Sequence, residues 1–137
     1  MEFVPLYHQK LSALFHGLRD PGYPCTKNQN RAIMILKTRG KETPSRLGEC
    51  LDMRRGSLTS LVYSLESMGL VRREPDPEDR RKVRLSLTEE GRSYVQRRYR
   101  AFEKALYEQF DPVPEGEIRS FNESLSSIVE TMKKLEI

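Results

Sequence analysis

A β-hairpin followed at once by a helix start, in residues 69–91, constrains the fold more than any other feature of this sequence. The pattern is a strand, a tight turn that is first acidic and then basic, a second strand, and a helix start capped by Thr88. Six residues between positions 72 and 84 are basic, namely Arg72, Arg73, Arg80, Arg81, Lys82 and Arg84. A hairpin that presents guanidinium groups from its tip suits a narrow groove of strong negative potential.

Two short helical segments, 43–51 and 54–68, precede the hairpin and are joined by a brief turn, as in a helix-turn-helix. The second segment has one apolar face, and its opposite face carries Gly56, Ser60, Tyr63 and Ser67, flanked by Thr59 and Ser64. Small polar side chains allow a close approach to base edges, whereas an ordinary solvated helix carries more Glu and Lys. We therefore predict a recognition helix within a winged helix whose partner is double-stranded DNA.

Four further helices are expected around this unit. Segment 2–19 places apolar residues at three- and four-residue steps, and Thr26 with Gln29 has the capping-box pattern that opens a second helix. A third helix begins after Thr88, and the last runs from about residue 114 to 135. The expected fold class is mainly α with a small β-wing (α+β), a winged helix-turn-helix with N- and C-terminal dimerisation helices.

The last helix carries a heptad-like apolar seam, which predicts a partner helix. Its members are Ile118, Phe121, Leu125, Ile128, Met132 and Leu135. The hydrophobic fraction of 36% is low for a self-sufficient monomer core, and this also favours burial between subunits. We expect a homodimer held together by Phe3, Leu6, Tyr7, Leu11, Phe121, Leu125, Ile128, Met132 and Leu135.

The distribution of charge says more than the total of +4. Residues 53–100 hold 12 Lys/Arg and 7 Asp/Glu, a net charge of +5, whereas residues 101–137 hold 4 and 8, a net charge of −4. This separation predicts a basic, nucleic-acid-binding surface in the middle of the chain and a different role for the acidic C-terminal segment.

Other function classes find little support in the sequence. No apolar run approaches the ~18–20 residues of a membrane span, so no membrane partner is expected. Cys25 and Cys50 lie far apart without metal-ligand spacing, and His8 and His16 have no nearby ligand set, so neither a metal nor another cofactor is expected. The chain has no catalytic triad or phosphate loop and is not expected to be an enzyme. Free thiols favour a cytoplasmic location.

Residues 26–92 resemble the MarR family of multiple-antibiotic-resistance-type regulators. The pattern runs from Thr26-x-x-Gln29, through Leu58-Thr59-x-Leu61-Val62-x-x-Leu65-Glu66-x-x-Gly69-Leu70-Val71-x-Arg73, to Asp76-Pro77-x-Asp79-x-Arg81 and Leu87-Thr88-x-x-Gly91. The last portion is the most specific, because a generic winged helix does not need it. The terminal helices match the family by length and periodicity alone.

The resemblance implies a homodimeric transcriptional regulator, usually a repressor, that binds a pseudo-palindromic operator. Its recognition helix would enter the major groove and its wing the flanking minor groove. The implied division of the chain is an N-terminal dimerisation helix and loop (1–25), a winged helix-turn-helix DNA-binding lobe (26–90) and C-terminal dimerisation helices (91–137).

By position, the resemblance makes Arg81 the wing arginine of the minor groove, with Arg80 and Lys82 beside it, and gives Asp79 the structural role of holding the wing. The recognition helix would supply Arg54, Arg55, Ser57, Thr59, Ser60 and Tyr63. One departure is the start of that helix, where family members often carry Asp, Arg, Ser and Thr, and this chain has Arg, Arg, Gly and Ser. We interpret Gly56 as a position where the backbone approaches DNA closely, although glycine lowers helix stability by up to ~1 kcal/mol relative to alanine.

Three alternatives stay open. A pocket for a small aromatic effector, which would release the DNA, could be lined by Tyr7, Phe15, Tyr23, Tyr99 and Phe102, although aromatic residues at helical spacing are more often plain core. Cys25 or Cys50 could make the chain a thiol-based redox-sensing regulator, although nothing in the sequence indicates a lowered pKa. The chain could also be a winged-helix protein-interaction module, against which the hydroxyl-rich recognition helix argues.

Overall fold

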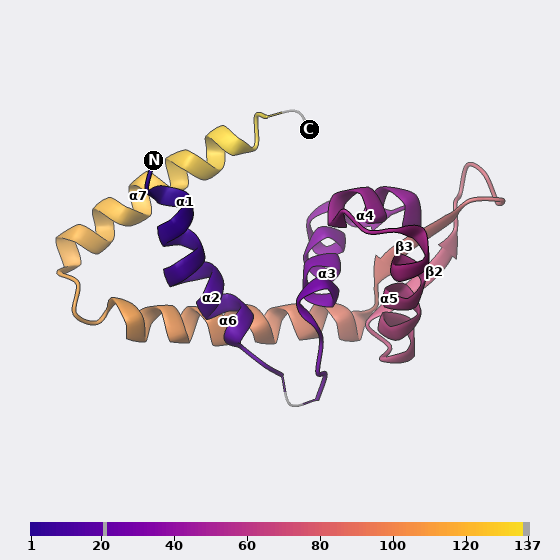
Figure 1. Cartoon of the computed structure of the whole chain (residues 1–137), viewed down its shortest axis with the longest axis horizontal. Helices are drawn as coiled ribbons and strands as arrows, with labels where there is room; N and C mark the ends of the chain where they lie inside the picture. The colour runs from indigo at the N-terminus through magenta and orange to yellow at the C-terminus, as the bar shows by residue number, and fades with distance from the viewer. Residues whose placement is uncertain (21, 136–137) are drawn as a thin grey trace. The chain divides into compact units, whose positions relative to one another are not determined.

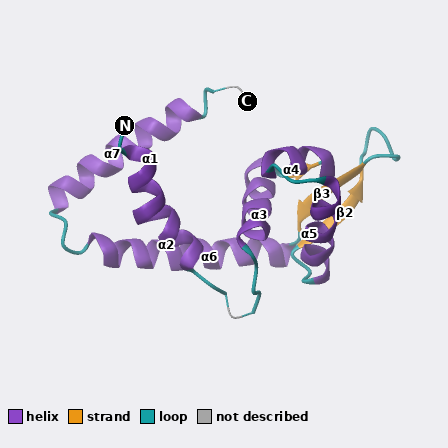
Figure 2. Cartoon of the chain, in the orientation of Figure 1, coloured by secondary structure: helices purple, strands orange, loops and turns teal. Residues whose placement is uncertain are grey.

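The computed structural model describes residues 1–20 and 22–135, and it is mostly helical with one small sheet (Figures 1 and 2). In chain order the elements are α1 (Phe3–Leu6), the π-helical segment η1 (Tyr7–Ser12), α2 (Ala13–Gly17), α3 (Lys27–Arg39), β1 (Lys41–Glu42), α4 (Pro44–Leu51), α5 (Arg55–Ser67), β2 (Val71–Pro75), β3 (Val83–Leu87), α6 (Glu89–Phe110) and α7 (Glu115–Met132). The predicted fold class, mainly α with a small β-wing, is confirmed.

The chain divides into two compact units, Met1–Phe102 and Glu103–Ile137, and α6 contributes residues to both. The first unit holds the helix-turn-helix and the hairpin. The second holds the C-terminal part of α6 together with α7. The boundaries of the predicted three-part division, after residues 25 and 90, stay predictions.

The helix starts in the first unit follow the capping residues that the sequence indicated. The Thr26 hydroxyl accepts a hydrogen bond from the Gln29 N–H (3.2 Å), and the Gln29 side chain accepts one from the Thr26 N–H (2.7 Å), which completes the capping box of α3. The Thr43 hydroxyl caps α4 by accepting from the Arg46 N–H (3.3 Å), and Thr88 caps α6 by accepting from the Gly91 N–H (2.9 Å). These local bonds fix where three of the helices begin.

The N-terminal helix differs from its predicted span of 2–19. Its middle six residues form the π-helical segment η1, and the helical backbone ends at Gly17. It stops there because Leu18 takes an extended conformation, with ψ at 127°. The C-terminal helix is also shorter than predicted, because Lys133 is the C-cap of α7 and Leu135 of the predicted seam lies beyond it.

The sheet has the strand order β1-β3-β2, with both pairings antiparallel. In the hairpin the register runs from Val71 opposite Leu87 to Pro75 opposite Val83, so residues 76–82 form a tip beyond the paired strands. Figure 1 shows this tip projecting past α4 and α5. The sheet therefore anchors the hairpin to the helices while its tip stands clear of them.

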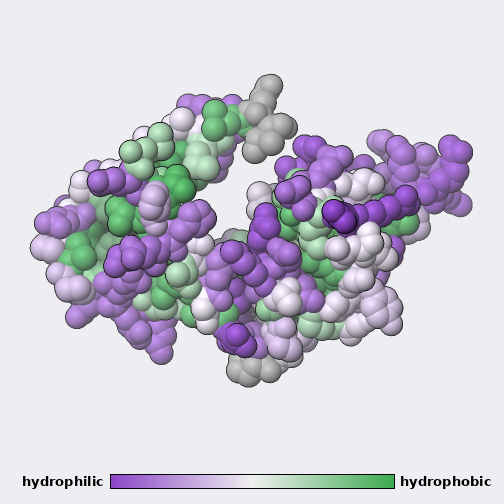
Figure 3. Space-filling model, viewed as in Figure 1, coloured by the Kyte–Doolittle hydropathy of each residue, from purple (hydrophilic) through white to green (hydrophobic). Residues whose placement is uncertain are grey.

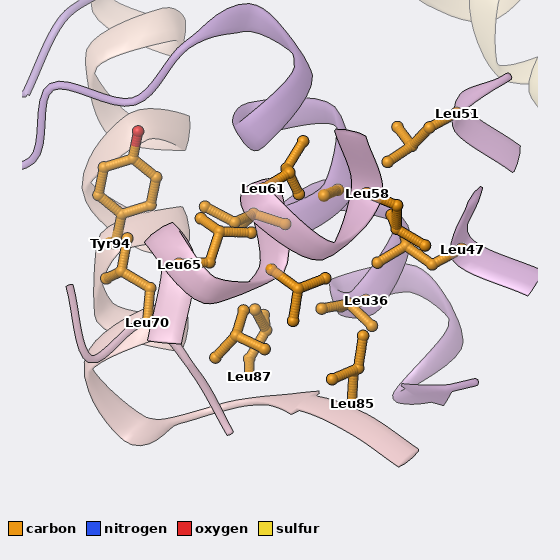
Figure 4. Close-up of a cluster of buried hydrophobic side chains, with 14 of the residues drawn as sticks. Leu36, Leu47, Leu51, Leu58, Leu61, Leu65, Leu70, Leu85, Leu87 and Tyr94 are labelled. Carbon is orange, nitrogen blue, oxygen red and sulfur yellow. The ribbon is translucent and has the colours of Figure 1, made fainter. Parts of the chain in front are cut away.

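A leucine-rich core lies between α3, α4, α5 and the sheet and is closed by the start of α6 (Figure 4). Its residues are Ala32, Ile33, Leu36, Leu47, Leu51, Leu58, Leu61, Val62, Leu65, Leu70, Val71, Leu85, Leu87, Tyr94 and Val95. The predicted apolar face of the recognition helix is buried here, which turns the opposite face of α5 to solvent. On α6, Tyr94 is fully buried, whereas Tyr99 is 41% exposed.

Across the described ranges 1–20 and 22–135, no helix combines the length and the apolar character needed to cross a membrane.

Candidate nucleic-acid interface

The outer face of α5 is exposed along its whole length, as the recognition-helix prediction requires. Ser57, Thr59 and Ser60 are exposed small residues, and Tyr63 is a large exposed one at 70%. The Thr59 hydroxyl donates to the carbonyl of Arg55 (2.9 Å) and the Ser60 hydroxyl to that of Gly56 (3.3 Å). These hydroxyl protons are thus used within the helix, which leaves the oxygen lone pairs directed outward as acceptors.

The start of α5 forms an electropositive end. Arg54 is the N-cap residue and makes no side-chain capping bond, and the first turn contains no acidic residue. The free N–H groups of the first turn therefore add their partial positive charge to the side chains of Arg54 and Arg55. An aspartate at position 54, which the family pattern often has, would cancel part of that charge. Arg54 adds to it instead.

Ion pairs divide the basic residues of the hairpin into two groups. On the strands, Nε of Arg73 lies 2.7 Å from the Glu66 carboxylate of α5, and Nε of Arg72 lies 2.7 Å from Glu74. Nε of Arg84 lies 2.7 Å from the carboxylate of Asp76. Each of these three arginines has a carboxylate partner, although Arg72 shares Glu74 with Lys41, and these contacts hold the hairpin in place. The sequence alone did not distinguish this role from one at the surface.

The second group, at the tip, faces solvent. The Arg81 side chain is 92% exposed, and its Nε contacts the Asp79 carboxylate at a longer distance of 3.3 Å. Arg80 and Lys82 are also exposed, and within the described part of the chain neither forms an ion pair. Figure 3 shows the tip as a hydrophilic projection. The positive charge available to a partner is therefore concentrated in residues 80–82.

A groove of about 910 Å³ runs between the helix-turn-helix and the hairpin. It is lined by Thr43, Pro44, Ser45, Gly48, Glu49, Asp52, Met53, Arg55, Leu58, Thr59, Val62, Arg73, Arg81, Lys82 and Val83. Arg55 and Thr59 of α5 and Arg81 and Lys82 of the tip thus come together on one concave surface. The other predicted contact residues (Arg54, Ser57, Ser60, Tyr63 and Arg80) are exposed but do not line it.

Comparison with known proteins places this arrangement in a family. The model of the MarR family matches residues 25–83, which carry the helix-turn-helix and the hairpin up to the end of the tip. These residues form a MarR-family domain. A Mycobacterium leprae protein named as an uncharacterized HTH-type transcriptional regulator is 35% identical over 91 residues, and the match covers 66% of this chain and 64% of that protein. An HTH-type transcriptional repressor of Pseudomonas putida, IacR, is 24% identical over 105 residues, covering 77% of this chain and 63% of the relative.

Solved structures of MarR proteins share the fold. A crystal structure of wild-type MarR from E. coli superposes with a TM-score of 0.75 at 22% identity, covering 92% of this chain and 93% of that one. The transcriptional regulator Tm0710 of Thermotoga maritima gives 0.79 at 22% identity, covering 96% and 92%. The family match confirms the predicted resemblance of residues 26–92 to the MarR family. The matched segment spans just under two thirds of the length of the Mycobacterium leprae relative.

The aromatic residues predicted to line an effector pocket divide into separate contacts. The rings of Phe15 and Phe102 meet edge to face with centroids 5.4 Å apart. Tyr23 instead packs against the buried Tyr94 at 5.8 Å, and Tyr7 stacks on its helical neighbour Phe3 at 6.0 Å. The pocket therefore stays a prediction, and the Phe15–Phe102 pair is the part of it that the described contacts bring together.

The surroundings of Cys25 are not those of a reactive thiol. Cys25 is half-buried against the core, and burial raises the pKa of its thiol. Cys50 is half-exposed. A raised pKa disfavours the thiolate, which is the form that reacts with oxidants. In the described residues, no group of three or more His, Cys, Asp or Glu side chains could hold a metal ion.

Sequence reasoning missed Arg98, which is 4% exposed on α6. Its guanidinium donates to the carbonyl oxygens of Leu18 (2.9 Å) and Phe15 (3.2 Å) and lies 4.8 Å from the ring centroid of Phe15. A buried cation at the C-terminal end of α2 is favoured by the helix dipole and by the aromatic ring. Arg98 thus fastens the end of the N-terminal helix to α6, and an arginine four residues after Tyr94 on the same helix face was the signal available in the sequence.

Proposed function

We propose that the protein is a MarR-family regulator, namely a homodimeric, sequence-specific double-stranded DNA-binding repressor. In this proposal α5 enters the major groove, and the hairpin tip enters the flanking minor groove. The observation that carries the proposal is the concave surface on which Arg55 and Thr59 of the helix meet Arg81 and Lys82 of the tip. An α-helix fits the width of the major groove, and an arginine-bearing tip suits the narrower minor groove beside it.

Charge and side-chain size support the same assignment. Exposed cations lie at the two places that would contact phosphate or the minor groove, which are the start of α5 (Arg54 and Arg55) and the tip. Between them the exposed face of α5 carries hydroxyl groups that can reach base edges. A protein-interaction module would instead present large apolar side chains, and Tyr63 is the one exposed large apolar residue described on α5. The repressor role draws support from the name of the Pseudomonas putida relative.

A second copy of the chain is the proposed cover for two apolar faces. On α1 and the start of η1, Phe3, Leu6 and Tyr7 are exposed, and on α7 the predicted seam is exposed from Phe121 to Met132. None of the described residues of α7 is buried within its own unit. Burying such faces against a partner is strongly favourable, at about 25 cal/mol per Å² of apolar surface. Two recognition helices about 34–36 Å apart would then read a pseudo-palindrome.

Replacing Ile128 by glutamate is expected to weaken the dimer, because a charge in the seam would be buried without a partner. The expected result is a shift toward monomer at micromolar concentration in sedimentation velocity. Ser126→Glu is the matched control, because it adds the same charge to the same helix off the seam. Equal sedimentation of the wild-type chain and both variants would contradict the assignment of this face.

Replacing Gly56 by alanine is expected to separate stability from DNA affinity. No atom lies within 4 Å of a Cβ built at this position, so the substitution fits and should stabilise the fold by up to ~1 kcal/mol. If the backbone approaches DNA closely here, operator affinity falls at the same time. Urea unfolding and fluorescence anisotropy measure the two effects, and unchanged or tighter DNA binding would exclude the close approach.

The experiment that tests the proposed function compares two duplexes. Purified protein is titrated into a fluorescent duplex from the region upstream of its own coding sequence and into a scrambled duplex, at two salt concentrations. The expected result is tight binding that prefers the native duplex and weakens as salt rises, with a log–log slope of about −0.9 per phosphate neutralised. Equally weak binding to both duplexes would remove this region as the operator.

A further inference from the structure

We propose that Asp76, rather than Asp79, is the positioning residue that fixes the hairpin tip for DNA binding. This inference rests on the proposed function, because its consequence for affinity requires that the tip contacts DNA. The sequence resemblance gave the structural role to Asp79. The contacts of the two carboxylates point to the other residue.

Asp76 links the two arms of the tip through both its backbone and its side chain. It is 4% exposed and stands directly after the end of β2. Its N–H donates to the Lys82 carbonyl across the hairpin (2.9 Å), and one carboxylate oxygen, Oδ2, accepts from Nε of Arg84 on β3 (2.7 Å). The other oxygen, Oδ1, accepts from the N–H of Glu78 (2.9 Å). The base of the tip is therefore closed by one buried residue.

Asp79 makes a more local set of contacts. A single oxygen, Oδ1, accepts from the Arg81 N–H (3.1 Å) and from Nε of Arg81 (3.3 Å). Both donors belong to the residue two positions along the chain, so the Asp79 side chain orients Arg81 but does not join the two arms. Its side chain is also more exposed than that of Asp76.

The charge state of Asp76 is fixed by the same contacts. Hydrogen bonding from Arg84 and then from the Glu78 N–H holds the pKa of Asp76 below its ordinary value, and Asp76 in turn raises the pKa of Arg84. A depressed carboxyl pKa means that the link is lost only when the pH falls through that lowered value. The link between β2 and β3 is thus intact at neutral pH.

The two carboxylates respond differently to an isosteric loss of charge. Asparagine has one acceptor oxygen, so Asp76→Asn cannot satisfy both Glu78 and Arg84, and its amide N–H would face one of these donors. Asp79→Asn keeps an oxygen for both Arg81 donors, because these share one oxygen in the native residue. Both variants remove one negative charge, but Asp76→Asn breaks a hydrogen bond of the native side chain whereas Asp79→Asn keeps both of its hydrogen bonds.

We expect Asp76→Asn to weaken operator binding about tenfold, because a buried donor left without its acceptor frees the tip to move. Asp79→Asn should stay within about threefold of the wild type, as exposed ion pairs contribute little. The salt dependence is the readout that separates positioning from general stability. Asp76→Asn should lower the log–log slope by about 0.9 for each phosphate contact that the tip loses.

A compensating substitution keeps the test decisive if Asp76→Asn destabilises the protein. In the double variant D76N/R84Q the amide at position 76 can donate to the amide oxygen at position 84 while its own oxygen accepts from Glu78. The link is then restored with the donor and acceptor exchanged. The operator affinity of the double variant should therefore lie within about threefold of the affinity of the single variant Arg84→Gln. Full wild-type affinity for Asp76→Asn, or no rescue in a folded double variant, would overturn the proposal.

Amide hydrogen exchange in the free protein separates this inference from the proposed function. Asp76→Asn should speed exchange at the Lys82 N–H, which donates to the Asp79 carbonyl (2.9 Å) inside the tip, whereas Asp79→Asn should not. This result does not depend on DNA. If exchange responds as expected but no duplex is bound by the wild type, the proposed function fails and the positioning of the tip by Asp76 stands. Equal exchange in both variants overturns the inference itself.

Discussion

Replacing Arg81 by alanine is expected to weaken operator binding by about 10- to 100-fold, the loss typical of a specific arginine contact. The side chain is 92% exposed, lines the groove beside Arg55 and Thr59, and is restrained by a 3.3 Å contact with Asp79. Such an arginine is already directed outward and gives up little when it enters a minor groove of strong negative potential. Anisotropy titrations at several salt concentrations measure the affinity and should show a slope reduced by about 1.

The matched control for Arg81→Ala is Arg72→Ala, which removes the same charge from the same hairpin. Arg72 lies 2.7 Å from Glu74, which also pairs with Lys41, and it donates to the Ser86 hydroxyl at 3.3 Å, so its side chain is held on the strand. We expect a clearly smaller loss of affinity for this variant. Equal losses for the two variants would mean that the hairpin contributes only general positive charge, and no loss for Arg81→Ala would remove the tip from the interface.

Replacing Gly91 by alanine is expected to lower the free energy of unfolding by about 3 kcal/mol, at the upper end for overpacking. Gly91 is buried in the first turn of α6, where an added Cβ would overlap the carbonyl oxygen of Leu70 and lie 3.4 Å from Cβ of Leu87. The helix cannot move away freely, because the Leu70 carbonyl accepts the Thr88 N–H (3.1 Å) at the start of the same helix. Urea unfolding followed by circular dichroism measures the change.

Gly116→Ala provides the control for this stability effect. Gly116 also lies in the first turn of a helix, α7, but nothing lies within 4 Å of a Cβ built there. Alanine is the better helix former, so stability should rise by up to ~1 kcal/mol or stay unchanged. If both variants unfold at the same urea concentration as the wild type, the result would contradict the close contact between Gly91 of α6 and the Leu70 carbonyl.

Features that depend on neighbouring residues could be predicted from the sequence. Thr26, Thr43 and Thr88 cap helices through bonds that reach three residues along the chain, and hydrophobic periodicity identified the buried face of α5. The hairpin followed from its turn residues. Gly91 was named in the family pattern, and the structure supplies the reason, because α6 packs directly on the Leu70 carbonyl.

Features that depend on long-range contacts could not be predicted in this way. The six basic residues of the hairpin look equivalent in the sequence, and only the fold pairs Arg73 with Glu66 and leaves Arg81 exposed. Asp76 and Asp79 both stand in the quoted motif, but the burial of Asp76 depends on Arg84 from the opposite strand. Likewise, the place of Arg98 depends on the carbonyl groups of Leu18 and Phe15, about 80 residues earlier.

The central claim is that α5 and the hairpin tip together read a DNA sequence as part of a dimer. A selection from random duplexes with the purified full chain tests it most directly. The account predicts enrichment of a pseudo-palindrome whose half-sites lie about 10–10.5 base pairs apart, and loss of that enrichment for Arg81→Ala. Recovery of unrelated sequences with no common site by the wild-type protein would contradict the account and would favour a protein-interaction module.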